Sequence, residues 1–104
     1  MSGICGIFSR NGNPLAQDLI GQMLSTLGLR GPDGQRTWQE GRAALGHQLL
    51  WTTPESKFEK LPLVDGETDL VLCCDARIDN RTELCIELGI RQGGAEVIPD
   101  SYFI

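Results

Sequence analysis

The chain begins with residues 1–9, MSGICGIFS, which include two side chains that can act as nucleophiles, Ser2 and Cys5. Residues 3–9 predict a short buried strand whose glycines let other backbone approach closely. Successive side chains of a strand point to opposite faces, and positions 2 and 5 are an odd number apart. Ser2 and Cys5 therefore face opposite sides of the strand and cannot serve the same pocket.

The rest of the chain predicts an α+β fold, with antiparallel strands and a helix packed on one face. The further expected strands cover 35–41, 43–51 and a nearly continuous apolar, buried run at 69–78. The expected helices cover 14–27, with Asn13 as the N-cap and Pro14 at the first position, and Asn80 to about Gly89. Pro99–Asp100 suits the start of another helix, and the expected loops are 30–34 and 52–60.

Composition and charge exclude several function classes. The chain has 104 residues, 40% hydrophobic and 22% charged, which indicates one soluble globular domain or less. A net charge of −5 offers no attraction for nucleic acid or an anionic membrane. No apolar run reaches the roughly 18 residues of a membrane span, and no signal peptide is recognisable. We expect a cytoplasmic protein that binds neither nucleic acid nor membrane.

The four cysteines are Cys5, Cys73, Cys74 and Cys85, and none forms a C-x-x-C pair. The single histidine, His47, has no partner histidine, so we expect no metal site. An even count also permits disulfides, but reduced thiols are the expected state in a cytoplasm. Cys73 and Cys74 lie in an apolar run, which favours buried, inert thiols.

The carboxyl end breaks off just after an apolar pattern begins, at Ser101-Tyr102-Phe103-Ile104. Because native C-termini are usually polar and frayed, we expect the chain to be cut from something longer. Sheet edges and an apolar face would then be uncovered, and such surfaces favour self-association. We therefore expect a homo-oligomer.

Several stretches occur in a fixed order along nearly the whole chain: MSGICGIFSRNG, the helix, RGPDG, LGHQLL, PES and DARIDNRTEL. This set resembles the amino-terminal domain of the asparagine synthetases, which are class II glutamine amidotransferases among the N-terminal-nucleophile hydrolases. The resemblance implies two sheets sandwiched between helix layers, with residues 1–104 forming an incomplete domain. In the family this domain hydrolyses glutamine and passes ammonia to a synthetase domain that uses ATP and magnesium. That second domain is absent from this chain.

The resemblance places Ser2 at the nucleophile position, because the family pattern Met, Cys, Gly, Ile, any residue, Gly matches MSGICG. In the family the nucleophile is the first residue of the mature chain, and its own α-amine, with a pKa of roughly 7.7 to 8.0, acts as the base. Ser2 needs only the removal of Met1, whereas Cys5 would need four residues cut away. Serine is the weaker nucleophile, which favours reduced activity.

The other pocket positions implied by the resemblance mostly depart from the family. Leu49 replaces the arginine that holds the substrate carboxylate, and leucine cannot make that bidentate contact. Asp75, Ala76 and Arg77 replace an Asn-Gly-Glu that stabilises the oxyanion and binds the substrate ammonium. Aspartate repels a developing negative charge, and arginine reverses the sign that the ammonium meets. Asp100 aligns with a second ammonium-binding carboxylate and is retained.

Some residues have plainer interpretations. Arg30, in the retained Arg30-Gly31-Pro32-Asp33 stretch, fits a turn with an arginine brace, and the resemblance implies a substrate-pocket position as the alternative. His47 fits a hydrogen-bonded strand histidine. Asp75 and Arg77 fit a local charge pair or solvent-facing groups.

The hypothesis that follows is a degenerate glutaminase-type domain of an asparagine-synthetase-like protein. Such a domain serves as a structural partner, as the resemblance implies for β-lactam synthetases and lasso-peptide cyclases. One alternative is an active glutaminase domain that supplies ammonia, with Ser2 or a processed Cys5 as nucleophile. The other is a small independent binding module.

Overall fold

A computed structural model describes residues 2–91 and 98–104. The chain divides into two compact units. The first comprises Met1–Leu50 and Lys60–Asp75, and the second Trp51–Glu59 and Ala76–Ile104. Each unit is described separately below.

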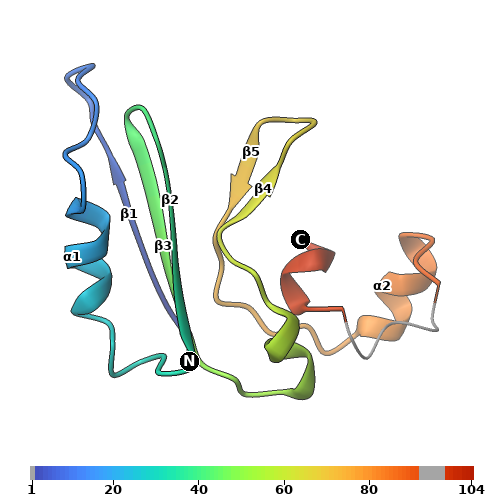
Figure 1. The fold of residues 1–104 in the computed structure, drawn as a ribbon. Coiled ribbons are helices and arrows are strands. Elements are labelled where there is room, and N and C mark those ends of the chain that lie inside the picture. The colour runs from blue at the N-terminus through green and yellow to red at the C-terminus, as the bar shows by residue number, and fades with distance from the viewer. Residues whose placement is uncertain (1, 92–97) are drawn as a thin grey trace. The chain divides into compact units, whose positions relative to one another are not determined.

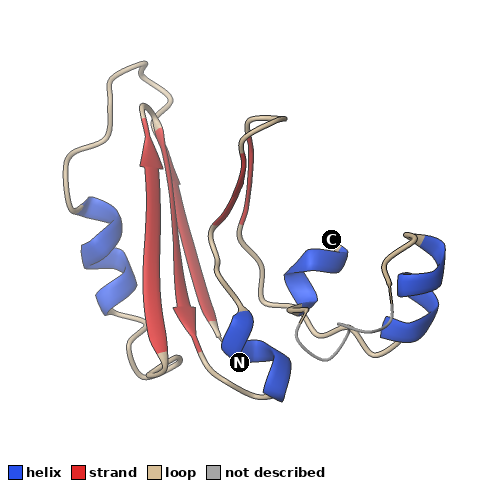
Figure 2. Ribbon diagram, turned by 45° about the vertical axis from the view of Figure 1, so that its right-hand side comes forward, coloured by secondary structure: helices blue, strands red, loops and turns tan. Residues whose placement is uncertain are grey.

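The first unit is built on a three-stranded antiparallel sheet in the order β1-β3-β2 (Figures 1 and 2). Its strands are β1 (Gly3–Phe8), β2 (Gly34–Glu40) and β3 (Ala43–Leu49). β2 and β3 form a hairpin whose turn contains Gly41 at a φ of 54°, a conformation that glycine adopts without strain. The predictions of strands at 3–9, 35–41 and 43–51 are confirmed to within two residues.

Helix α1 (Leu19–Ser25) packs on one face of this sheet, as Figure 1 shows. Ile20 and Leu24 are its buried residues, and Leu24 is fully buried. Gly46 at the centre of β3 leaves room for both, because a Cβ there would lie 3.3 Å from Leu24 Cδ1 and 3.4 Å from Ile20 Cγ1. Ile20 and Leu24 therefore supply the contribution of this helix to the core, whereas Leu19 and Met23 of the same helix are 38% and 37% exposed.

The helix predicted over 14–27 is wrong in its first five residues and at its end. The Leu15 N–H donates to the carbonyl of Gly41, at 3.1 Å, so it is committed to the β-hairpin. Asn13 is not a helix cap, because its N–H donates to Asn11 Oδ1 at 3.0 Å in a local turn. The helix begins only after Asp18, which has a φ of 66°. A long-range backbone contact thus overrides the local propensity.

The apolar run at 69–78 does not form the buried strand that its composition predicts. Its strand β5 (Leu70–Leu72) pairs with β4 (Leu63–Asp65) in a separate two-stranded antiparallel sheet. The Leu70 side chain is 67% exposed. The run has a single strand partner among the described residues, so pairing ends after three residues and much of the apolar surface stays uncovered.

In its described residues, the second unit contains three short helical segments: η1 (Pro54–Phe58), α2 (Arg81–Glu87) and η3 (Asp100–Phe103). Helix α2 confirms the helix expected between Asn80 and Gly89, and η3 confirms a helical turn starting after Pro99. Residues 52–60 are not simply a loop. Thr53 and Ser56 form a capping box that starts a 3-10 turn at Pro54.

Short helices and two antiparallel sheets make this a mixed structure compatible with the expected α+β class. The layered sandwich implied by the family resemblance stays a prediction. Within residues 2–91 and 98–104, no helix has the length and apolar character required to span a bilayer. In the same residues, no group of three or more His, Cys, Asp or Glu is arranged to hold a metal ion.

Candidate functional site

Ser2 lies just before β1, at the end of the sheet where β3 finishes. The pairing of Gly3 with Gln48 brings Ser2 beside the residues that follow Gln48. The half-buried Ser2 Oγ accepts a hydrogen bond from the Leu50 N–H at 3.1 Å. The hydroxyl at the expected nucleophile position is thus fixed by backbone, with its own proton still available to another acceptor.

Cys5 lies on the opposite, helix-covered face of the sheet. Its Sγ is 2.8 Å from the point where a Cβ on Gly46 would lie, and Leu24 of α1 borders the same point. Burial raises the pKa of the Cys5 thiol above its ordinary value of 9.0, and a hydrogen bond from the Gly46 backbone only partly opposes this. The opposite orientation predicted for Ser2 and Cys5 agrees with this placement, and the Cys5 thiol is poorly suited to attack.

The turn at residues 31–33 packs against the end of β3. Gln48 Nε2 donates to the carbonyl of Gly31, and the Asp33 N–H donates to the Leu49 carbonyl at 3.1 Å. A side chain at position 31 would collide with β3, because a Cβ there would lie 2.5 Å from the Gln48 carbonyl oxygen. The turn therefore holds the strand end beside Ser2 and leaves Leu49 half-buried.

Arg30 is exposed and makes no ion pair within the described residues, so the expected arginine brace is not seen there. Gln48 does the bracing instead. Its side chain is 5% exposed, and its Oε1 is the one buried side-chain oxygen or nitrogen in the described residues with no hydrogen-bond partner. The sequence feature that could have indicated this bracing role is the presence of a glutamine inside the apolar run LGHQLL. His47 is 3% exposed at the centre of the sheet, as a structural histidine should be.

Asp75, Ala76 and Arg77 are all exposed. Asp75 ends the first unit, whereas Ala76 and Arg77 belong to the second. Arg77 Nε pairs with Asp79 Oδ1 at 2.8 Å, and the two side chains are 77% and 79% exposed. A pair so exposed contributes at most about 1 kcal/mol to stability. The local charge pair considered for Arg77 is therefore present, with Asp79 as its partner.

Asp100, the retained carboxylate, is ion-paired with Arg81 at the start of α2. Their side chains are 13% and 18% exposed, so this pair is far better shielded from water than Arg77 and Asp79. The sequence analysis missed Arg81, because an arginine in the first turn of a short helix is usually solvent-exposed. Its position just after the Asn80 cap gave no signal of burial.

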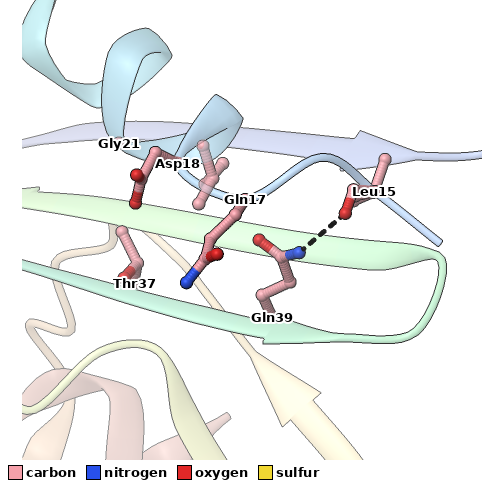
Figure 3. Close-up of a pocket in the computed structure, with 7 residues that line it drawn as sticks. Leu15, Gln17, Asp18, Gly21, Thr37 and Gln39 are labelled. Atoms are coloured by element: carbon pink, nitrogen blue, oxygen red, sulfur yellow. Dashed lines mark hydrogen bonds between the residues drawn. The ribbon is translucent and has the colours of Figure 1, made fainter.

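The described residues of the first unit line hollows at more than one place. One, of about 510 Å³, lies between α1 and the hairpin, and Gln39 Nε2 donates to the Leu15 carbonyl at its rim at 3.3 Å (Figure 3). Another, of about 500 Å³, is lined mainly by apolar residues of the three-stranded sheet and by residues 69–71. Neither of these includes Ser2, Leu49 or Asp75.

Comparison with known protein families gives one match. A family model described as a glutamine amidotransferase domain matches residues 1–100. The chain belongs to this glutamine amidotransferase domain family. No curated protein and no solved structure matches the chain.

Within this amidotransferase domain, the expected pocket positions are divided between the two units. Ser2 and Leu49 lie at the same end of the β1–β3 pair, next to the turn that follows Arg30. Arg77 and Asp100 belong to the second unit, and each is ion-paired within it. Of the charged pocket positions, Arg77 and Asp100 are thus paired inside the second unit, whereas Arg30 and Asp75 make no ion pair among the described residues.

Proposed function

We propose that this amidotransferase domain is impaired in glutamine hydrolysis and serves as a structural partner of an ATP-dependent synthetase domain. The whole protein would form amide bonds, as an asparagine-synthetase-like enzyme does, and ATP with magnesium would act in the synthetase domain. The resemblance of the ordered stretches from MSGICG to DARIDNRTEL supports this context.

The observation that carries the proposal is the apolar end of β3. Leu49 occupies the position at which the family uses an arginine to hold the substrate carboxylate, and it lies at the same sheet end as Ser2. A carboxylate brought to this end meets a leucine side chain and loses its hydration without gaining a counter-charge. Glutamine binding in this orientation is therefore unfavourable.

Two further features support an impaired site. Asp75 would repel the oxyanion that forms when a nucleophile attacks an amide, and loss of one oxyanion donor typically costs about 100- to 1,000-fold in rate. The serine at position 2 also lacks the nucleophilicity of cysteine. Cys5 does not substitute for it, because burial raises its pKa and its thiol lies on the helix-covered face.

The decisive test is ammonia release from L-glutamine by the purified chain, after intact mass has shown whether Met1 is removed. We expect a rate that Ser2→Ala does not lower, because no Ser2-dependent hydrolysis occurs. Circular dichroism of each variant provides the check on folding. The matched control is Cys5→Ala, which removes the other candidate nucleophile near the start of the chain.

Ammonia release that is abolished by Ser2→Ala would overturn the proposal and establish an active glutaminase. Release abolished by Cys5→Ala but not by Ser2→Ala would instead place the nucleophile at Cys5. A third measurement is calorimetric titration with L-glutamine, for which we expect no saturable binding to the wild-type chain and none after Leu49→Arg alone, since the other charges stay mismatched.

A further inference from the structure

The apolar hollow of about 500 Å³ in the first unit lies on the face of the three-stranded sheet that α1 does not cover. Gly6, Leu45 and Trp38 pair directly across β1, β3 and β2, so their side-chain positions share one face. The adjacent row, which contains Cys5 and Gly46, faces α1. Because faces alternate along a strand, the row that lines the hollow faces away from the helix.

Small residues at two positions of this face leave the space. Gly6 has no side chain, and Ala43, which pairs with Phe8, has only a methyl group. A Cβ on Gly6 would lie 3.1 Å from Leu45 Cδ2, so a side chain there would take up part of the hollow. The apolar lining is completed by Trp38, Leu70 and Val71. A concave site of this volume, lined by aromatic and aliphatic side chains, has the character of a small-molecule site.

Asp69 is the one ionisable residue in the lining of this hollow. Its side chain is exposed, and it makes no ion pair among the described residues. A ligand in the hollow therefore meets apolar side chains on most sides and an uncommitted negative charge at one point of the rim. This combination favours a ligand with an apolar body and a cationic head group.

One cation lies near the lining without belonging to it. The guanidinium of Arg42 is 5.3 Å from the centroid of the Phe8 ring, and this cation–π contact engages its charge. Asp69 therefore determines the sign of the charge that a ligand meets at the rim. The net charge of −5 acts in the same direction, because it attracts cations to the chain as a whole.

We propose that this hollow binds a small amphipathic amine, a ligand with an aromatic or aliphatic body and a protonated amino group. The body fills the space between Phe8, Leu45 and Trp38, and the ammonium lies at the rim beside Asp69. Burial of the body supplies most of the affinity, and the exposed carboxylate supplies the preference for a cation. This inference goes beyond the proposed function, because it uses none of the pocket positions that the family resemblance implies.

The test is a titration of the full chain with three probes that share a phenylethyl body: phenethylamine, phenethyl alcohol and phenylpropanoate. Trp38 lines the hollow, so its fluorescence in a Trp51→Phe background reports binding there. We expect a saturable change with phenethylamine and a dissociation constant on the order of 1 mM, as suits so small a ligand. The amine should bind about threefold more tightly than the alcohol, and the anion should bind most weakly.

Two matched substitutions test the charge. Asp69 has a φ of 58°, and Asp69→Asn removes its charge without backbone strain, because asparagine adopts this conformation readily. The amine and the alcohol should then bind with affinities that differ by less than about 1.5-fold. Asp18→Asn is the control. Asp18 is also an exposed aspartate with a positive φ, of 66°, but it lines the hollow beside α1, so its replacement should leave the preference for the amine unchanged.

A third substitution tests the location. Gly6→Ala should weaken the binding of all three probes, because its Cβ enters the hollow beside Leu45. Circular dichroism checks that each variant is folded. If Gly6→Ala does not fold, the probe series with Asp69→Asn and Asp18→Asn still decides the question. Unchanged affinities in a folded Gly6→Ala would overturn the inference.

Other results would also overturn it. These are the lack of a saturable response to any probe, and a preference for the amine that survives Asp69→Asn. Tighter binding of phenylpropanoate would assign the head group to Arg42 in place of Asp69. An apparent affinity that falls as the chain concentration rises would mean that a second copy of the chain covers the hollow. All of these measurements are independent of ammonia release, so the proposed function and this inference stand or fall separately.

Discussion

The sharpest structural prediction concerns Gly31, which the retained Arg-Gly-Pro-Asp turn places against β3. A Cβ at this position would lie 2.5 Å from the Gln48 carbonyl oxygen and 2.7 Å from the Leu49 carbonyl carbon. Both are backbone atoms, so no change of rotamer can relieve the overlap. Gly31→Ala must therefore move the turn away from the strand.

The magnitude follows from what that movement breaks. The turn is held by the Gln48 Nε2 bond to the Gly31 carbonyl and by the Asp33 N–H bond to the Leu49 carbonyl. Each such bond contributes about 1 kcal/mol, and overpacking alone typically costs about 1–3 kcal/mol. We expect Gly31→Ala to lower the free energy of unfolding by about 2–4 kcal/mol.

Gly21→Ala is the matched control. Gly21 is an exposed residue inside α1, and a Cβ there would meet nothing within 4 Å. Alanine is the better helix former, so this substitution should raise the free energy of unfolding by about 0.5–1 kcal/mol. Urea unfolding followed by Trp38 fluorescence, in the same unit, measures both. If Gly31→Ala lowers the free energy of unfolding by less than about 0.5 kcal/mol, the reasoning is refuted, because the close approach of Gly31 to β3 then does not constrain this position.

Three further predictions follow from the thiols and the exposed apolar surface. Burial raises the pKa of Cys73 to about 11, with smaller contributions from Cys74 and Cys5, so the folded chain holds this proton more tightly than an unfolded thiol of pKa 9.0. The free energy of unfolding should then fall as pH rises through this interval and not below it, and Cys73→Ala should reduce that dependence to the part that comes from the raised pKa of Cys5 in urea titrations. Gly46→Ala should cost about 1–3 kcal/mol, because its Cβ would lie 2.8 Å from Cys5 Sγ, and Cys5→Ala should restore most of the loss in a double-mutant cycle. Phe8 is 63% exposed, so light scattering after size-exclusion chromatography should show dimers or larger species, and a monomer would contradict the expected self-association.

The first sheet was predictable because its signals are local. The stretch GICGIF forms β1, and β2 and β3 are separated by a turn with Gly41 at a positive φ. The error in the first five residues of the expected 14–27 helix could not be recognised from neighbouring residues. The hydrogen bond from the Leu15 N–H to the Gly41 carbonyl joins segments that are far apart in the sequence. The strand expected at 69–78 forms only over Leu70–Leu72 and is not buried, because an apolar run indicates hydrophobicity and not the number of strand partners.

The sequence predicted on which face of the strand the candidate residues lie, but it did not predict which residues contact them. The alternation of a strand separates Ser2 from Cys5, and the structure places Cys5 on the helix-covered face. The partner of Asp100 could not be foreseen, because Arg81 lies nineteen positions earlier in the chain and reads as a surface residue. Gln48 was similarly overlooked, although a glutamine within an apolar strand demands a hydrogen-bond partner once it is buried.

The proposed impairment of the site follows from its charges and does not require any damage to the fold. The pairing of β1 with β3 that positions Ser2 is intact, and the Leu50 N–H fixes its hydroxyl. A zwitterionic ligand binds by replacing water around free charges of opposite sign, and a charge already paired within the protein must first lose that partner. Arg77 and Asp100 are paired in this way, and Leu49 offers no charge. Under the proposed function, glutamine recognition would therefore require new unpaired charges at these positions, and the same scaffold would still act as a docking partner.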